Sequence, residues 1–324
     1  MTDTALQGES QQPGEPAVLE DVPGWFWDHD RHSFEWFLKR QTKRGVTGDL
    51  LEMGAYLGRS AIVIGEHLQP GETFTVCDLF DSDAPDEENS SEMDISYRKT
   101  LTRSAFEANY LSFHDELPDV IQAPTSVLAG GRIPAAAYRF IHIDASHLYE
   151  HVVGDLEVAR VALQDQGVVV LDDYRAQHTP GVAAATWEAV FNHGLKPIML
   201  TECKFYGTWG DPEPFQRDLL DRVDLASGCE LSTETLNGRQ LLRMTGSSEG
   251  IGPFRASRHR RRPAVEQSDY RDELRAARDE AARDLAVRRA RAAEARRPVN
   301  VAKRAARDLL PPVVTSAIRR ARRG

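Results

Sequence analysis

The chain is predicted to adopt an α/β fold in which a mainly parallel, seven-stranded sheet carries helices on both faces. Two observations predict it. Between residues 49 and 244, short apolar runs of strand length alternate with longer amphipathic, helix-like stretches. The first strand-like run also leads through a glycine-containing turn into a helix-like segment, which is how a doubly wound sheet begins.

The elements follow in order along the chain. An aromatic cluster between residues 25 and 37 predicts a short amphipathic helix at 34–38, packed over the core. The expected strands are residues 49–53, 73–77, 120–122, 140–143, 168–171, 198–201 and 240–244. The expected helices are residues 60–68, 98–113, 150–163, 182–193 and 214–225.

Composition divides the chain into four parts. Residues 1–20, rich in Gln, Pro and Gly, are predicted to be a disordered lead-in, and 21–246 to form the α/β domain. Residues 247–264 read as a linker, and 265–324 as a basic, Ala/Arg-rich helical tail. The net charge of −10 hides an asymmetry, because residues 255–324 carry +12 and residues 1–254 carry −22.

Cysteine usage and hydropathy exclude several classes of protein. The three cysteines are widely spaced, so they predict neither a disulfide framework nor a Cys-x-x-Cys metal pair. No apolar run has the length of a signal peptide or a membrane span. We therefore expect a cytoplasmic protein, and the basic tail leaves peripheral attachment to a membrane open as an alternative.

The end of the first strand carries the first functional signal. Glu52 closes the strand, the chain turns through Gly54 and Gly58, and a helix begins near Ser60. Glycines let backbone approach a ligand, and a helix start offers free N–H groups. The spacing matches neither the dinucleotide fingerprint nor a P-loop, and such a turn can also serve the fold alone.

Asp78 ends the second strand. A carboxylate at this position can accept hydrogen bonds from both ribose hydroxyls of a nucleoside, although a lone Asp after a strand can also cap a helix. The acidic stretch that follows, residues 81–94, is either a mobile lid or a solvated insertion.

Carboxylates end two further strands. Asp144 follows the strand at 140–143, and Asp172 and Asp173 follow the strand at 168–171. Neighbouring strand ends would bring the three together, where their repulsion calls for a cation, and an oxygen-only set suits Mg²⁺.

His147 lies three residues beyond Asp144. Beside a metal-bound hydroxyl it would have a pKa suited to accepting a proton near neutral pH. The alternative is that Asp144 caps a helix and His147 is a packed imidazole.

With these motifs assembled, residues 45–210 resemble a class I S-adenosylmethionine-dependent methyltransferase with a Rossmann-like fold. The nearest relatives are the metal-dependent sugar O-methyltransferases of the macrocin, mycinamicin and rhamnosyl type, with cephalosporin-hydroxylase-like proteins. The resemblance implies cofactor contacts from Glu52, Gly54, Tyr56, Gly58, Ser60, Asp78, Ser126 and Asp144. It also implies Mg²⁺ ligands at Asp144, Asp172 and Asp173, and catalysis by His147 with Asp144.

The implied reaction is methylation of a hydroxyl group on a sugar, a glycosylated small molecule or a polysaccharide by a homo-oligomeric enzyme. Thr125 stands where relatives have an Asp, and Ala145 and Ser146 stand where many have Gly and Asp. Side chains on late loops could rim the acceptor pocket or be ordinary surface and core: His178, Lys204, Phe205, Tyr206 and Trp209.

Two alternatives remain open at this level. A hydroxylase-like relative could use the same fold and motifs for another reaction. The chain could instead act through residues 255–324, whose arginine clusters could bind an anionic membrane surface, nucleic acid or an acidic partner. The simplest interpretation of that tail is a solvated helix that mediates self-association or contacts the acidic body.

Overall fold

The computed structural model describes residues 15–90 and 101–259. The expectations for residues 1–14, for the end of the acidic stretch and for the basic tail fall outside these residues. Among the helices in the described ranges, none is long and apolar enough to span a bilayer.

The core of the protein is a nine-stranded sheet with the order β3-β2-β1-β4-β5-β7-β6-β9-β8. Strands β1 to β5 pair in parallel, β7 runs antiparallel to β5 and β6, and β8 runs antiparallel to β9. The strands are β1 (Asp49–Met53), β2 (Phe74–Asp78), β3 (Asp119–Gln122), β4 (Tyr138–Ile143), β5 (Leu163–Leu171), β6 (Lys196–Leu200), β7 (Phe205–Thr208), β8 (Cys229–Leu236) and β9 (Arg239–Gly246).

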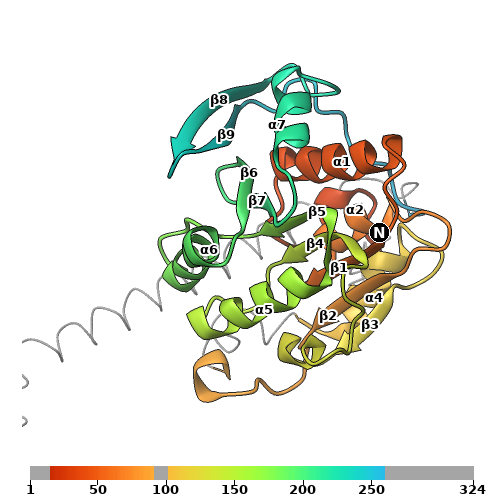
Figure 1. The fold of residues 1–324 in the computed structure, drawn as a ribbon. Helices are drawn as coiled ribbons and strands as arrows, with labels where there is room; N and C mark the ends of the chain where they lie inside the picture. The colour runs from red at the N-terminus through yellow and green to blue at the C-terminus, as the bar shows by residue number, and fades with distance from the viewer. Residues whose placement is uncertain (1–14, 91–100, 260–324) are drawn as a thin grey trace, which may run out of the picture. The chain divides into compact units, whose positions relative to one another are not determined.

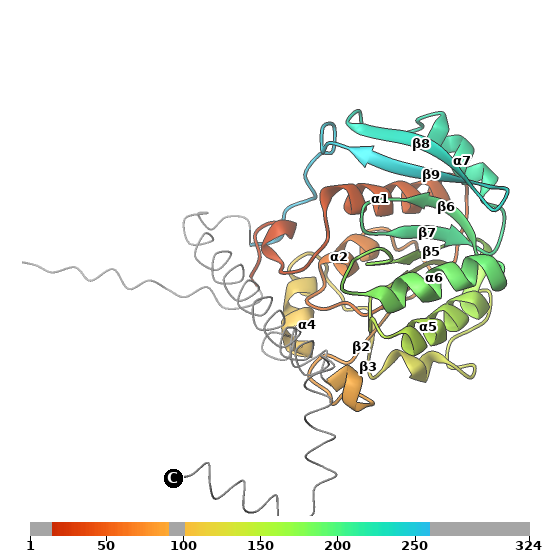
Figure 2. The same ribbon diagram turned by 90° about the vertical axis from the view of Figure 1, so that its left-hand side faces the viewer.

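Helices cover both faces of the sheet (Figures 1 and 2). Because side chains alternate along a strand, Leu50 packs into one core and Leu51 into the other. The first core is lined by α1 (Asp28–Lys43), α2 (Arg59–Gly65), α4 (Arg103–Leu111) and α7 (Glu213–Leu220). The second is lined by α5 (Tyr149–Ala162) and α6 (Pro180–Asn192).

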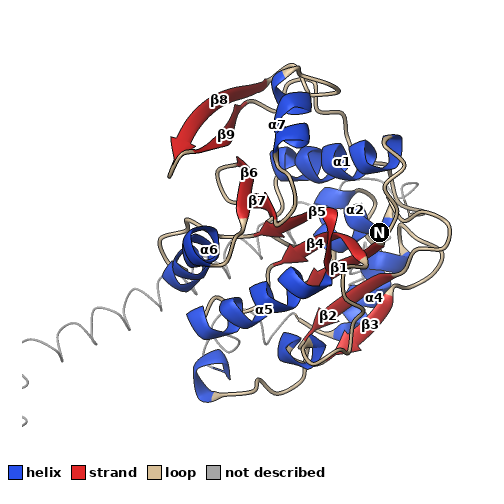
Figure 3. Ribbon diagram, viewed as in Figure 1, coloured by secondary structure: helices blue, strands red, loops and turns tan. Residues whose placement is uncertain are grey.

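The predicted fold class is confirmed, but the number of strands was wrong. The two strands that the sequence did not predict are β7 and β8, both visible in Figure 3. Strand β7 has only four residues and begins five residues after β6 ends, so the sequence pattern there predicted one strand followed by a loop. Most residues of β8 are exposed or half-buried, so its sequence lacks the apolar alternation of a core strand.

Several helices have different lengths from those expected. Helix α2 ends at Gly65 rather than at 68, and α4 spans Arg103–Leu111 rather than 98–113. Helix α1 extends from Asp28 to Lys43, well beyond the predicted 34–38. Its buried face includes polar residues such as Asp30 and Gln41, so apolar spacing alone marked only its middle. Helix α7 ends at Leu220 rather than near residue 225. A short 3₁₀ helix, Thr125–Leu128, follows β3.

The segments expected to be a disordered lead-in and a linker are partly folded. Leu19 is buried in the first core, and Phe254 packs against it with its ring 6.2 Å from that of Phe113. The two segments also contact each other, since the Ser257 amide donates to the Ala17 carbonyl at 3.1 Å. Composition alone predicted these segments to be unfolded because a few apolar side chains, such as Leu19 and Phe254, are surrounded in sequence by polar residues.

The carboxyl ends of the central strands are drawn together by backbone hydrogen bonds. The Gly54 amide donates to the Cys77 carbonyl at 2.8 Å, and the Asp144 amide donates to the Met53 carbonyl at 2.8 Å. Gly54 has φ +81°, and a Cβ there would lie 2.1 Å from the Asp144 carbonyl oxygen. Glycine is required at this position because β1 and β4 approach each other so closely.

We predict that Gly54→Ala destabilises the protein by more than the roughly 1–3 kcal/mol that left-handed backbone alone costs a non-glycine residue. Gly71→Ala is the matched control, because Gly71 has φ +87° with nothing within 4 Å of its Cβ position. Urea denaturation of both variants measures the difference. Equal losses of stability would contradict the role of the close approach.

Candidate active site

The residues predicted from strand ends meet at one edge of the sheet. Asp78, Asp144 and Asp172 stand at the ends of β2, β4 and β5, and Glu52 lies near the end of β1. The register pairs Met53 with both Cys77 and Ile143, and Ile143 with Leu171, so these ends are level with one another.

Asp78 organises the glycine turn. Its Oδ2 accepts hydrogen bonds from the amides of Ala55 at 2.7 Å and Tyr56 at 3.0 Å, and its Oδ1 accepts one from Phe80 at 2.6 Å. Burial raises the pKa of Asp78, while these three amides oppose that rise. In this structure the predicted ribose ligand therefore also holds the turn between β1 and α2 in place.

Glu52 is fully buried and pairs with a buried histidine. Its Oε1 lies 2.8 Å from His142 Nδ1, on the neighbouring strand. Within the described ranges, its Oε2 is buried and has no hydrogen-bond partner. Burying a carboxylate oxygen without a hydrogen bond is unfavourable, and a ligand at the glycine turn could provide the missing donor.

Lys204, for which the sequence left a pocket rim and ordinary surface or core open, lies in the core. It lies opposite Asp172 because β7 pairs antiparallel with β5, with Phe205 facing Leu171. Its side chain is fully buried, and its Nζ lies 2.5 Å from Asp172 Oδ2 and 3.4 Å from His142 Nε2. Phe205 and Tyr206, the next two late-loop candidates, are also buried in the core rather than exposed at a pocket rim.

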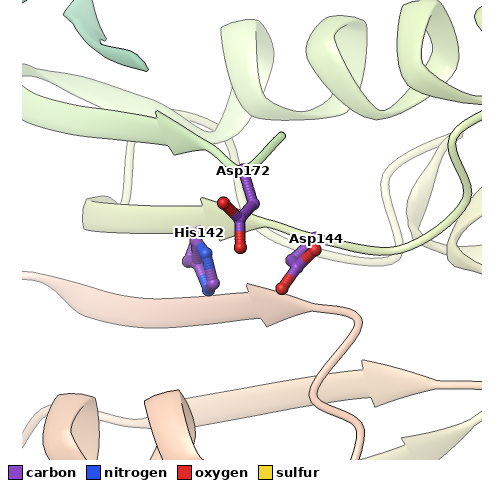
Figure 4. Close-up of side chains that lie close together, drawn as sticks. All are labelled: His142, Asp144 and Asp172. Atoms are coloured by element: carbon purple, nitrogen blue, oxygen red, sulfur yellow. The ribbon is translucent and has the colours of Figure 1, made fainter. Parts of the chain in front are cut away.

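In the described part of the chain, His142, Asp144 and Asp172 form a group of side chains that could hold a metal ion, called the acidic cluster below. Figure 4 shows the three side chains converging from β4 and the end of β5. Each offers one potential ligand atom, and these atoms lie within 4.8 Å of one another. The sequence predicted two of the three and missed His142, whose position inside a strand gives no signal.

The charges of this cluster are set by burial and by Lys204. Burial raises the pKa of Asp144 strongly, and the charge of Asp172 raises it further. Burial also opposes the ionisation of Asp172, but the Lys204 ammonium group, together with the Asp173 amide and other neighbours, lowers the Asp172 pKa overall. Burial, followed by Lys204, lowers the pKa of His142, so its imidazole is neutral.

Asp30 extends the network from α1. It is buried, its Oδ1 accepts a hydrogen bond from Thr201 Oγ1 at 3.0 Å, and burial raises its pKa to about 6 against the opposing charge of Lys204. Thr201 in turn accepts the Lys204 amide at 3.0 Å. The β6–β7 turn that presents Lys204 is thereby tied to α1.

Asp173 lies apart from this cluster and beside two histidines. Its backbone has φ +52°, and its Oδ2 is 3.7 Å from His147 Nε2 and 3.9 Å from His178 Nε2. Burial raises the pKa of Asp173, as does the charge of Asp172, while the two histidines lower it. The strand end thus directs Asp172 inward to Lys204 and Asp173 outward to His147.

These positions do not fit the octahedral Mg²⁺ site that the sequence predicted from Asp144, Asp172 and Asp173. Asp173 faces the histidines, and a neutral imidazole takes its place in the cluster. Both oxygens of Asp172 already have partners, since Oδ2 is bound by the Lys204 ammonium group and Oδ1 accepts the hydrogen bond of the Asp173 amide at 2.8 Å. Mg²⁺ requires near-ideal octahedral geometry and mainly oxygen ligands.

The other predicted cofactor contacts lie around the glycine turn and the end of β3. Gly58 has φ +93° at the start of α2, and Ser60 is buried in the first turn of that helix. Ser126 is exposed on the 3₁₀ helix after β3. Beneath that helix, Asp155 is buried on α5, at a position that no sequence motif marks.

Residues 51–174 match the family model described as a methyltransferase domain. This stretch runs from the end of β1 to the residue after Asp173, so it contains the glycine turn, Asp78, Asp144, His147 and Asp172. The central region of the chain is thus similar to a methyltransferase domain. No curated protein matches the chain at the level of significance required.

Several solved structures resemble this one. The O-methyltransferase NovP is 18% identical, with 56% of this chain and 79% of that chain covered and a TM-score of 0.43. CalS11, a TDP-rhamnose 3'-O-methyltransferase of calicheamicin biosynthesis, is 18% identical over 56% and 81%, with a TM-score of 0.38. TomG from Streptomyces achromogenes, an O-methyltransferase of tomaymycin synthesis, is 13% identical over 55% and 80%, with a TM-score of 0.36.

Removing one partner of the Lys204–Asp172 pair should destabilise the protein strongly. We expect Lys204→Met to cost about 3–5 kcal/mol, because it leaves a buried carboxylate without its counter-charge, and expect Asp172→Asn added to it to recover most of that loss. Urea denaturation measures both. Lys196→Met, which removes a lysine that donates to the Gly210 carbonyl at 2.7 Å, serves as the control and should cost about 1 kcal/mol.

Asp155 should make stability depend on pH. Burial raises its pKa to about 6, so the folded state holds a proton that the unfolded state releases from pH 4 upward. Stability contributed by this residue is therefore lost as pH rises from about 4 to about 6. Asp155→Asn should become more stable than wild type by about 3 kcal/mol at pH 7 but not at pH 4, and parallel pH profiles would contradict this.

Proposed function

We propose that the chain transfers a methyl group from S-adenosylmethionine to a hydroxyl group of a sugar or a glycosylated small molecule. One observation carries the proposal. The segment that matches a methyltransferase domain ends its strands in Asp78, Asp144 and Asp172, and the fold gathers these residues with Glu52 and His147 at one edge of the sheet. The acceptor class comes from the resemblance of the motifs to sugar O-methyltransferases.

The glycine turn suits the cofactor. The buried, unpaired Oε2 of Glu52 can accept a hydrogen bond from the ammonium group of the methionine portion. Asp78 fixes the amides of Ala55 and Tyr56, which shapes the turn against the nucleoside. When bound, S-adenosylmethionine supplies a methyl group made electrophilic by the sulfonium charge.

His147 is the proposed general base. Its ring is largely enclosed, with 18% of the side chain exposed, and its Nε2 faces the Asp173 carboxylate. The imidazole can take the proton of an acceptor hydroxyl, and Asp173 then stabilises the imidazolium that forms. Holding the hydroxyl in line with the methyl group is the other requirement, and rigid strand ends serve it well.

The first experiment is calorimetric titration of the purified protein with S-adenosylmethionine, followed by incubation of the complex with a panel of sugar acceptors. Mass analysis of the products distinguishes an added methyl group from the added oxygen of a hydroxylase-like relative. Absence of cofactor binding would remove the proposed function.

We predict that His147→Ala lowers turnover by about 10²-fold or more, the usual contribution of a general base, without changing affinity for S-adenosylmethionine. His178→Ala is the matched control, because His178 also faces Asp173 but its side chain is 61% exposed, and its loss should have a much smaller effect. Steady-state kinetics and calorimetry report the two quantities. Wild-type turnover in His147→Ala would exclude it as the base.

A further inference from the structure

We propose that the Lys204 ammonium group is the resident cation of the acidic cluster and takes the place of a divalent metal ion in this chain. The first argument is position. The antiparallel pairing of β7 with β5 sets Lys204 opposite Asp172, so the fold itself delivers a positive charge to the strand ends. It does so at the carboxylates that a metal ion would otherwise neutralise.

The second argument is that the ammonium already contacts two of the three potential metal ligands. Nζ lies 2.5 Å from Asp172 Oδ2 and 3.4 Å from His142 Nε2. His142 Nδ1 lies 2.8 Å from Glu52, a carboxylate that accepts hydrogen bonds, and His142 Nε2 is the ring nitrogen that faces the Lys204 ammonium group, a donor. The ring nitrogen that could bind a metal ion is thereby aimed at the lysine.

The third argument is that a metal ion and this ammonium exclude each other. A Mg²⁺ ion bound to the same Asp172 oxygen at about 2.1 Å would lie no more than about 4.6 Å from Nζ. Like charges at that separation in a buried site repel strongly. The cluster can therefore hold one cation or the other.

The fourth argument is that Lys204 has no route out of the site. Its side chain is fully buried, and its Nζ lies 5.5 Å and 5.8 Å from the ring centres of Phe26 and Phe34, in a favourable cation–π arrangement. The turn that carries it is closed by the Thr201 amide, which donates to the Lys204 carbonyl at 2.9 Å. A metal ion would have to displace a side chain fixed at both ends.

For catalysis, this assignment rests on the proposed function and deepens it. The fixed charge of Lys204 keeps Asp172 ionised without an exchangeable ion, and the proton of the acceptor is left to His147 and Asp173. Methyl transfer is then expected to continue unchanged in excess chelator.

Mn²⁺ binding followed by electron paramagnetic resonance tests the proposal without reference to activity. The full-length wild type should bind no stoichiometric Mn²⁺ at the cluster. Lys204→Met should gain one Mn²⁺ site with an affinity at least tenfold higher than any Mn²⁺ binding by the wild type. That site should be lost again when Asp144→Asn is added. Lys196→Met, which removes a lysine from the same hairpin away from the cluster, should behave as wild type.

Two results would overturn the proposal. One is a stoichiometric Mn²⁺ site in the wild type that Asp144→Asn abolishes, a titration that decides the question even if Lys204→Met does not fold. The other is folded Lys204→Met that binds no more Mn²⁺ than Lys196→Met. Titration with S-adenosylmethionine in chelator is independent of both, so failure of the proposed function would be recognised separately.

Discussion

The buried ion pair between Lys204 and Asp172 is the contact on which the organisation of the site depends. It joins the last parallel strand of the sheet to the antiparallel strand beside it, and it reaches His142 on β4 and, through Thr201, Asp30 on α1. A buried pair of this kind contributes little net stability compared with apolar packing, but leaving either member alone is costly. Its main effect is to fix how these elements meet.

The carboxyl edge of the sheet has two chemically different sides. On the inner side, Glu52, His142, Lys204 and Asp172 form a continuous buried chain of opposite or complementary charges. On the outer side, Asp173 faces His147 and His178. Asp172 and Asp173 are adjacent in sequence, and the left-handed backbone of Asp173 directs the one carboxylate to Lys204 and the other to the two histidines.

Much of this arrangement could be predicted from the sequence. The five parallel strands, and the acidic residues at the ends of four of them, were predictable because apolar runs mark buried strands, and parallel strands align their carboxyl ends. Lys204 was not, since its place depends on the pairing of a four-residue strand that carries no periodic signal. The sequence could not predict that the Asp172 side chain points inward and the Asp173 side chain outward, because two adjacent aspartates are equivalent until the backbone conformation is known.

The contact between Ala17 and Ser257 has a consequence for the connectivity of the chain. Residues 17 and 257, near the two ends of the folded unit, lie side by side, so the order of its strands along the chain could be changed without changing their arrangement in the sheet. A short peptide could join these ends, and the chain could be reopened at the exposed Gly130–Gly131 turn, where nothing lies within 4 Å of either Cβ position. Such a circular permutant would keep every strand neighbour of the sheet and every contact at its carboxyl edge.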